Sequence, residues 1–146
     1  FFFLSTPDPP VSPLFPYTPP SRPVHPAPAG RYPRLCRSPG GAWNPGSRFN
    51  RGIRARLAGE LGEMSYRYFD WDVCSGDAGE TTNTDTVAAN IISGCKGRSC
   101  AVVLQHDIKD FSVAAVEQVL QWGLENGYAF RALDLSSPAA HHGIAN

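Results

Sequence analysis

The stretch AVVLQHD, residues 101–107, decides the predicted fold. Its apolar half, Ala101–Leu104, has the length and composition of a buried strand, and His106 follows where that strand would end. A second strand-like run, YRYF at 66–69, ends in the same way in Asp70 and Trp71. Segments that follow buried strands carry many functional side chains. The two runs therefore predict one side of an α/β site to which His106 and Asp70 contribute.

Helical periodicity accompanies these strands. Apolar residues at positions 49, 53, 57, 61 and 64 predict a helix over residues 47–64 with one core-facing side. A second helix is expected after the polar loop 72–85, with Thr84 or Asp85 as its cap. Its expected core side chains are Val87, Ile91 and Ile92.

A third helix is predicted between residues 112 and 127. Ser112 would cap it, with Phe111 and Val116 as a hydrophobic staple across the cap, and Gly127 would end it. Its expected core face is Val113, Val116, Leu120 and Leu124. With a last strand at 128–133, the alternation of helices and strands predicts neighbouring parallel strands, hence an α/β sheet or barrel. Such a unit places its functional residues at the carboxyl ends of the strands.

The N-terminal part of the chain differs in composition. Thirteen of fourteen prolines lie at or before Pro45, and residues 1–33 form a Pro-rich, low-complexity segment. Proline removes backbone donors and disfavours helix, so this segment is expected to be extended or disordered. It reads as a linker, as a ligand for a partner, or as the translation of a frame not selected to encode protein. The folded domain is expected to span residues 34–146, and the absence of an initial Met predicts a piece of a longer reading frame.

Charge is also unevenly distributed. Residues 1–59 carry eight arginines and one acid, a net charge of +7, and residues 60–146 carry five basic and twelve acidic residues, a net charge of −7. A basic half invites a nucleic-acid interpretation, but no stacking motif or zinc-finger spacing accompanies it, so we expect a solvated basic face and no nucleic-acid partner. No apolar run is long enough to span a membrane, and no signal peptide is visible.

Four cysteines, Cys36, Cys74, Cys95 and Cys100, contain no metal-ligand pattern. Two states stay open at this level: four free thiols, or a small disulfide between Cys95 and Cys100 if the protein is exported.

Three motifs in order resemble those of the polysaccharide deacetylases. They are RSPGG at 37–41, YFDWDVCSGDA at 68–78 and VVLQHD at 102–107, and the tail with WGLENGYAF at 122–130, Ser137-Pro138 and HHG at 141–143 looks like the end of bacterial peptidoglycan members. The resemblance covers about residues 37–146. It implies the C-terminal part of a distorted (β/α) barrel, and metal-dependent hydrolysis of N-acetyl groups on an amino-sugar polymer such as peptidoglycan or chitin. It also implies an extracellular or cell-envelope location.

The resemblance assigns roles to individual residues. His106 matches the general acid, Asp70 the carboxylate that pairs with it, and Arg37 the arginine that orients the base. Pro39, Trp71 and Leu104 match positions that contact substrate, with Trp71 and Leu104 as the walls of the slot for the acetyl methyl. The alternatives are a His106 bonded to backbone, an Asp70 that caps a helix, and a Trp71 that belongs to the core.

The chain departs from the family pattern in two ways. Asp72 and Cys74 replace the usual Asn and Ser. The family's base and metal motifs should precede Arg37, yet residues 1–36 hold one Asp (Asp8), one His (His25) and many prolines. The full-length family uses a divalent metal, zinc by expectation, and this chain alone is expected to bind none. We expect His141 and His142 to be a solvated tail.

Two functions from different classes follow. The first is a fragment of a polysaccharide deacetylase, inactive alone. The second is a non-catalytic carbohydrate-binding remnant, or a truncated or frameshifted product. In either case we expect residues 34–146 alone to be marginally stable or prone to aggregation.

Overall fold

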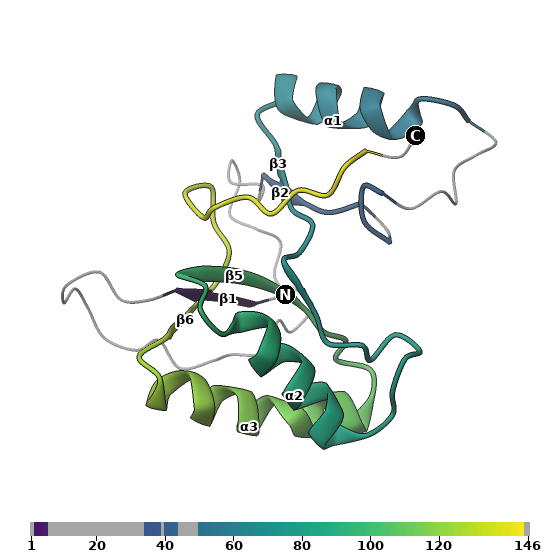
Figure 1. Cartoon of the computed structure of the whole chain (residues 1–146). Helices are drawn as coiled ribbons and strands as arrows, with labels where there is room; N and C mark the ends of the chain where they lie inside the picture. Colours follow the sequence, from purple (N-terminus) through teal and green to yellow (C-terminus); the bar gives the residue numbers. More distant parts are fainter. Residues whose placement is uncertain (1, 6–33, 39, 44–49, 145–146) are drawn as a thin grey trace, which may run out of the picture.

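The computed structural model describes residues 2–5, 34–38, 40–43 and 50–144, and Figure 1 shows their arrangement. Three helices are described: α1 (Ile53–Glu63), α2 (Thr84–Cys95) and α3 (Asp110–Glu125). The described strands are β1 (Phe2–Ser5), β2 (Leu35–Cys36), β3 (Arg67–Tyr68), β4 (Val73–Cys74), β5 (Cys100–Leu104) and β6 (Ala129–Arg131). The predicted mixture of helices and strands is confirmed.

The described strands form two sheets. The larger has the order β4-β5-β1-β6, and the smaller pairs β2 with β3 in parallel. Strand β4 runs parallel to β5, with Val73 opposite Val103. Strand β1 is antiparallel to both β5 and β6 and lies between them. We expected the last two strands, β5 and β6, to be parallel neighbours. This expectation is wrong, because β1 lies between them and pairs with both.

The N-terminal strand was not expected as part of the sheet. Residues 1–33 were predicted to be extended or disordered, and within them the structure describes only Phe2–Ser5, as a strand. The rest of that segment lies outside the described residues. A closed barrel is not among the described elements, because both sheets end in open edges.

The core lies between the larger sheet and the α2–α3 pair, which lie side by side below the sheet in Figure 1. Val87 and Ile91 of α2 are fully buried, as predicted, together with Val103 of β5 and Val119 of α3. Gly94 lets α2 approach β4 closely, because a Cβ there would lie 2.5 Å from Val73 Cγ1.

The start of α2 differs from the expectation. Its N-cap is Asn83, whose side chain accepts a hydrogen bond from Thr86 N at 2.9 Å, and neither Thr84 nor Asp85 is the cap. Asn is among the preferred capping residues because its short side chain can satisfy an unpaired amide of the first turn.

The buried residues of α3 lie one position earlier in the sequence than the predicted core residues. Val113 and Leu124, expected inside, are 51% and 57% exposed, and the buried residues are Ser112, Ala115, Val119 and Gly123. The helix begins at Asp110 with Lys109 as N-cap, so Ser112 lies in the first turn and not at the cap. One residue corresponds to about 100° around a helix. The face of small residues allows α3 to lie close to α2 and the sheet.

The predicted core face of α1 is only partly covered, with Ile53 and Leu61 half-buried. The helix begins at Ile53 instead of residue 47, and Phe49 lies outside the described residues. No residue of α1 is buried, and Leu57 and Met64 are 44% and 56% exposed. The periodicity predicts the helix correctly, but the described residues do not bury its apolar side completely. None of the described helices is long and apolar enough to cross a membrane.

We expect Ile91→Val to lower the free energy of unfolding by about 0.5–1.5 kcal/mol, because it removes one methyl group from a side chain with 0% exposure. Urea unfolding followed by circular dichroism measures this change. Val113→Ala, on the exposed side of α3, is the control and should change stability by less. Equal losses for the two variants would contradict the assignment of the core.

Candidate functional site

His106 is hydrogen-bonded to Asp77. His106 follows β5 after one residue, and its Nδ1 lies 2.8 Å from Asp77 Oδ1. The backbone N–H of His106 donates to the other carboxylate oxygen, Oδ2, at 2.7 Å. Asp77 is buried, with its side chain 1% exposed, whereas the His106 side chain is 33% exposed. One carboxylate therefore fixes both the backbone and the ring of His106.

Further donors surround Asp77. Ser112 Oγ donates to Oδ2 at 2.5 Å, and Lys109 Nζ donates to the Asp77 backbone carbonyl. Burial alone would raise the pKa of Asp77. The hydrogen bonds from Ser112 and from the side chain and backbone of His106 outweigh burial and lower this pKa to about 2. Asp77 is consequently ionised at any pH near neutrality.

An ionised carboxylate only accepts hydrogen bonds, so His106 Nδ1 carries a proton in this pair. The second ring nitrogen, Nε2, is then the one that can give or take a proton. Among the described residues, none forms a hydrogen bond with Nε2, and the ring is partly exposed. This geometry fits a general acid or base whose working atom is Nε2.

Asp70 makes different contacts, so its predicted pairing with His106 is wrong. Its carboxylate is fully buried and accepts the backbone N–H of Ala42 and of His142, each at 2.9 Å. Its own N–H donates to Ala140 O at 2.8 Å. The physical reason is the path of the chain: β4 lies parallel beside β5, and the turn that follows β4 brings Asp77, not Asp70, to His106. Asp70 joins three segments distant in sequence.

The two tail histidines make specific contacts with the rest of the chain, although His141 is exposed as expected. His141 stacks on Tyr68 with ring centroids 4.1 Å apart, and its Nε2 lies 3.0 Å from Tyr68 O. His142 Nε2 donates to Trp71 O at 2.7 Å, and its ring meets the Trp71 ring edge-on at 4.6 Å. His142 Nδ1 is buried and has no hydrogen-bond partner among the described residues. The tail thus covers the end of β3.

The predicted substrate residues fall in two places. Trp71 packs with Val102 and Ala140, and a Cβ at Gly41 (φ +81°) would lie 2.8 Å from its ring. The Arg37 motif therefore reaches Trp71 through Gly41. Leu104 ends β5, 8% exposed and two positions before His106. Pro39 lies outside the described residues.

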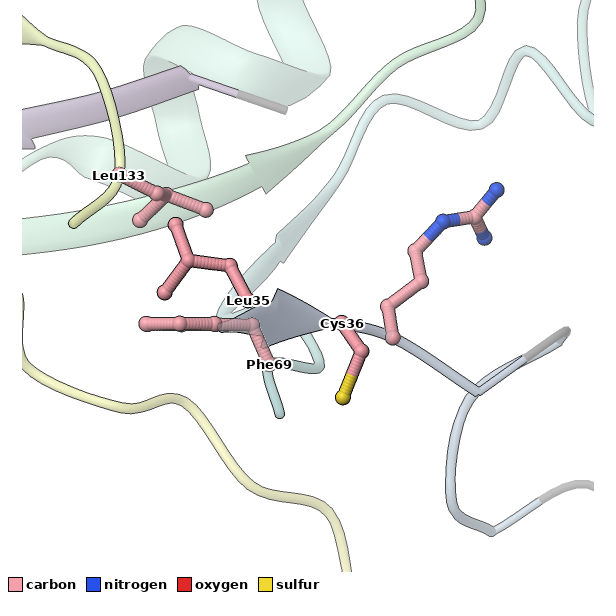
Figure 2. Close-up of a pocket in the computed structure, with 5 residues that line it drawn as sticks. Leu35, Cys36, Phe69 and Leu133 are labelled. Atoms are coloured by element: carbon pink, nitrogen blue, oxygen red, sulfur yellow. The ribbon is translucent and has the colours of Figure 1, made fainter. Parts of the chain in front are cut away.

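Arg37 follows β2 at the edge of an apolar pocket of about 200 Å³. The pocket is lined by Leu35, Cys36, Arg37, Phe69 and Leu133, and Figure 2 shows the leucines and Phe69 pointing toward one another. His106 and Asp77 do not line it. The described structure therefore does not bring Arg37 and His106 into one cavity.

Asp72, one of the two departures from the family pattern, has a structural role. Its carboxylate Oδ2 accepts the N–H of Val102 at 2.8 Å, and its own N–H donates to Val102 O at 2.8 Å. Asp72 therefore ties the start of β4 to β5.

The described residues do not fit a divalent metal. Among them, no three His, Cys, Asp or Glu side chains converge as a ligand set. The potential metal-ligand atoms of His106 and Asp70 are occupied by hydrogen bonds. His106 Nδ1 contacts Asp77, and both Asp70 oxygens accept backbone amides. All four cysteines are free thiols, so the Cys95–Cys100 disulfide is absent from this structure. Burial raises the pKa of Cys95 to about 11.

We expect Asp70→Asn to lower the free energy of unfolding by about 1 kcal/mol, because an amide can accept only one of the two backbone hydrogen bonds. Hydrogen exchange should speed up at the amides of Ala42 and His142, which measures the loss directly. Asp107→Asn, at an exposed position, is the control. Unchanged exchange at both amides would show that Asp70 does not hold these segments together.

Comparison with known proteins gives one informative match. No family model matches the chain, and no curated protein matches it. Among solved structures, the catalytic domain of the peptidoglycan N-acetylglucosamine deacetylase from Eubacterium rectale is similar, with 46% sequence identity and a TM-score of 0.73. The match covers 77% of this chain and 52% of that domain, so the chain spans about half the length of its neighbour. The resemblance to polysaccharide deacetylases is confirmed.

Proposed function

We propose that this chain forms part of a deacetylase that removes the acetyl group from N-acetylglucosamine residues of peptidoglycan. The observation that carries this proposal is the His106–Asp77 pair, which lies at the end of β5 in a chain 46% identical to a peptidoglycan deacetylase domain. The substrate would be an amino-sugar polymer, and the place of action the cell envelope or the extracellular space. The complete catalytic domain would be the distorted (β/α) barrel of the family.

His106 would act as the general acid. Hydrolysis of an N-acetyl group expels an amine, which is a poor leaving group unless a proton reaches its nitrogen. Asp77 holds the Nδ1 proton and fixes the plane of the ring, so His106 Nε2 is free to carry the transferred proton.

Other residues would contact the substrate. Leu104 precedes His106 by two residues at the end of β5, which would put the acetyl methyl within reach of the acid. Trp71 would form the opposite wall of the slot, and Pro39 would lie on the substrate side of the Arg37 motif. Arg37 would orient the base. The base of the family and the ligands of its divalent metal would come from residues outside those described.

A second function is a carbohydrate-binding module without catalysis. It is favoured by the lack, among the described residues, of a ligand set for a metal. Cosedimentation of the chain with insoluble peptidoglycan distinguishes the two when it is combined with an assay for acetate.

The test uses a hybrid domain. Residues 34–146 of this chain would be joined to the part of the Eubacterium rectale catalytic domain that the chain does not cover. We expect the hybrid to release acetate from N-acetylated peptidoglycan in the presence of zinc. The chain alone is expected to bind the polymer and to release none.

The control is the full Eubacterium rectale domain, assayed under the same conditions. A hybrid that folds cooperatively and binds peptidoglycan, yet releases no acetate, would contradict the deacetylase function. It would favour the binding module instead.

A further inference from the structure

Ser112 is a fully buried polar residue that the proposed reaction leaves without a role. It lies in the first turn of α3 with 0% exposure, and its hydroxyl donates to Asp77 Oδ2 at 2.5 Å. A hydroxyl shielded from water in this way must find its partner inside the protein. That partner is the carboxylate that holds the ring of His106.

We propose that Ser112 is a positioning residue for His106, which acts through Asp77 by locking the carboxylate in the orientation that keeps the His106 proton on Nδ1. The meaning of this role for catalysis rests on the proposed function. The geometry and its test do not.

The hydrogen bonds divide the two oxygens of Asp77 between two tasks. Oδ1 faces the ring of His106, whereas Oδ2 accepts the backbone N–H of His106 and the hydroxyl of Ser112. Two donors on Oδ2 fix the rotation of the carboxylate about its last bond, so Oδ1 points at Nδ1. Without the hydroxyl, Oδ2 would lose one of these two donors, and the carboxylate could turn away from the ring.

The hydroxyl is itself held in place. Gln105, which precedes His106, donates from Nε2 to Ser112 O at 2.5 Å. Lys109, the residue that caps α3, donates from Nζ to the backbone carbonyl of Asp77. The start of α3 and the loop that carries Asp77 are thus joined at two points, and the Lys109 hydrogen bond does not involve the Ser112 side chain. The hydrogen bond from Ser112 is also the largest of the interactions that lower the pKa of Asp77.

The test measures which ring nitrogen of neutral His106 carries the proton. Nitrogen chemical shifts of the imidazoles distinguish the Nδ1–H from the Nε2–H tautomer, and free histidine favours Nε2–H. The measurement uses the full chain at a pH where the ring is neutral. We would compare the wild-type chain with Ser112→Ala, Ser112→Cys and Ser112→Thr.

We expect wild-type His106 to be almost entirely the Nδ1–H tautomer. Ser112→Ala should lower the ratio of Nδ1–H to Nε2–H about tenfold, because it removes one hydrogen bond to a charged group. Ser112→Thr keeps a hydroxyl and should restore the wild-type ratio. Ser112→Cys, close to serine in size but a weak donor, should behave like alanine, which keeps the test informative if the alanine variant does not fold.

Val113→Ala is the control on the neighbouring, exposed position of α3, and should leave the ratio unchanged. A wild-type ratio in a folded Ser112→Ala or Ser112→Cys chain would overturn the proposal. The outcome is independent of the deacetylase assay: a shifted tautomer in a chain whose hybrid domain releases no acetate would keep the positioning role and reject the function.

Discussion

Replacement of His106 by alanine is expected to lower acetate release by the hybrid domain about 10²- to 10⁴-fold, the range typical of a lost general acid. The loss should fall on kcat, because the imidazole donates its proton only as the amine leaves. KM should change little, since the predicted walls of the acetyl slot, Trp71 and Leu104, remain. Initial rates over a range of peptidoglycan concentrations measure both constants.

The matched control for this variant is His141→Ala. It removes an imidazole that stacks on Tyr68 at the surface, and the hybrid should retain most of its activity. If His106→Ala retained as much activity as the control, His106 would not be the acid. Circular dichroism of both variants checks that the hybrid is still folded.

The second large effect is expected from Asp77→Asn, which should lower the free energy of unfolding of the chain by about 3 kcal/mol at neutral pH. The variant replaces a buried anion that accepts hydrogen bonds from His106 and Ser112 by a neutral amide. One of the two oxygens becomes a donor facing other donors. Urea unfolding measures the loss.

The same carboxylate predicts a pH dependence. The pKa of Asp77 is lowered from 3.8 to about 2 in the folded chain, so between these values the unfolded chain binds more protons. The stabilisation by Asp77 is therefore fully present above about pH 4 and is lost as the pH falls toward 2. The contribution of Asp77 to the free energy of unfolding that is lost in this pH range amounts to about 2 kcal/mol.

Wild-type stability should accordingly fall more steeply between pH 5 and about pH 2 than the stability of Asp77→Asn. Asp107→Asn, at an exposed position, should follow the wild-type curve. Parallel curves for wild type and Asp77→Asn would mean that Asp77 is not the strongly hydrogen-bonded carboxylate described here.

The sequence predicts the position of His106 after a buried strand correctly and its partner wrongly, for physical reasons. A short apolar run followed by a histidine locates a strand end, because Val102 and Val103 must be buried and the polar residues after them need not be. The partner depends on which turn folds back beside β5, and Asp70 and Asp77 both lie within the same motif. The signal that favours Asp77 is the glycine before it: Gly76 has φ +79°, which turns the chain after β4.

For the helices too, the local sequence pattern predicts where they lie, whereas their tertiary contacts are not predicted. All three were predicted from periodicity, but the buried side of α3 is a row of small residues, and a search for large apolar residues selects the wrong face. Ser112 was predicted as a cap because serine is common there, whereas its hydroxyl bonds to Asp77 in the core. The tail histidines were misjudged because their contacts with Tyr68 and Trp71 join residues about seventy positions apart.

The most direct test of the central claim is mass spectrometry of peptidoglycan fragments after treatment with the hybrid domain and digestion to disaccharides. Our account predicts that the glucosamine residues lose one acetyl group each while the neighbouring muramic acid residues keep theirs, and that His106→Ala abolishes the change. Fully acetylated disaccharides from a folded hybrid that binds the polymer would contradict it.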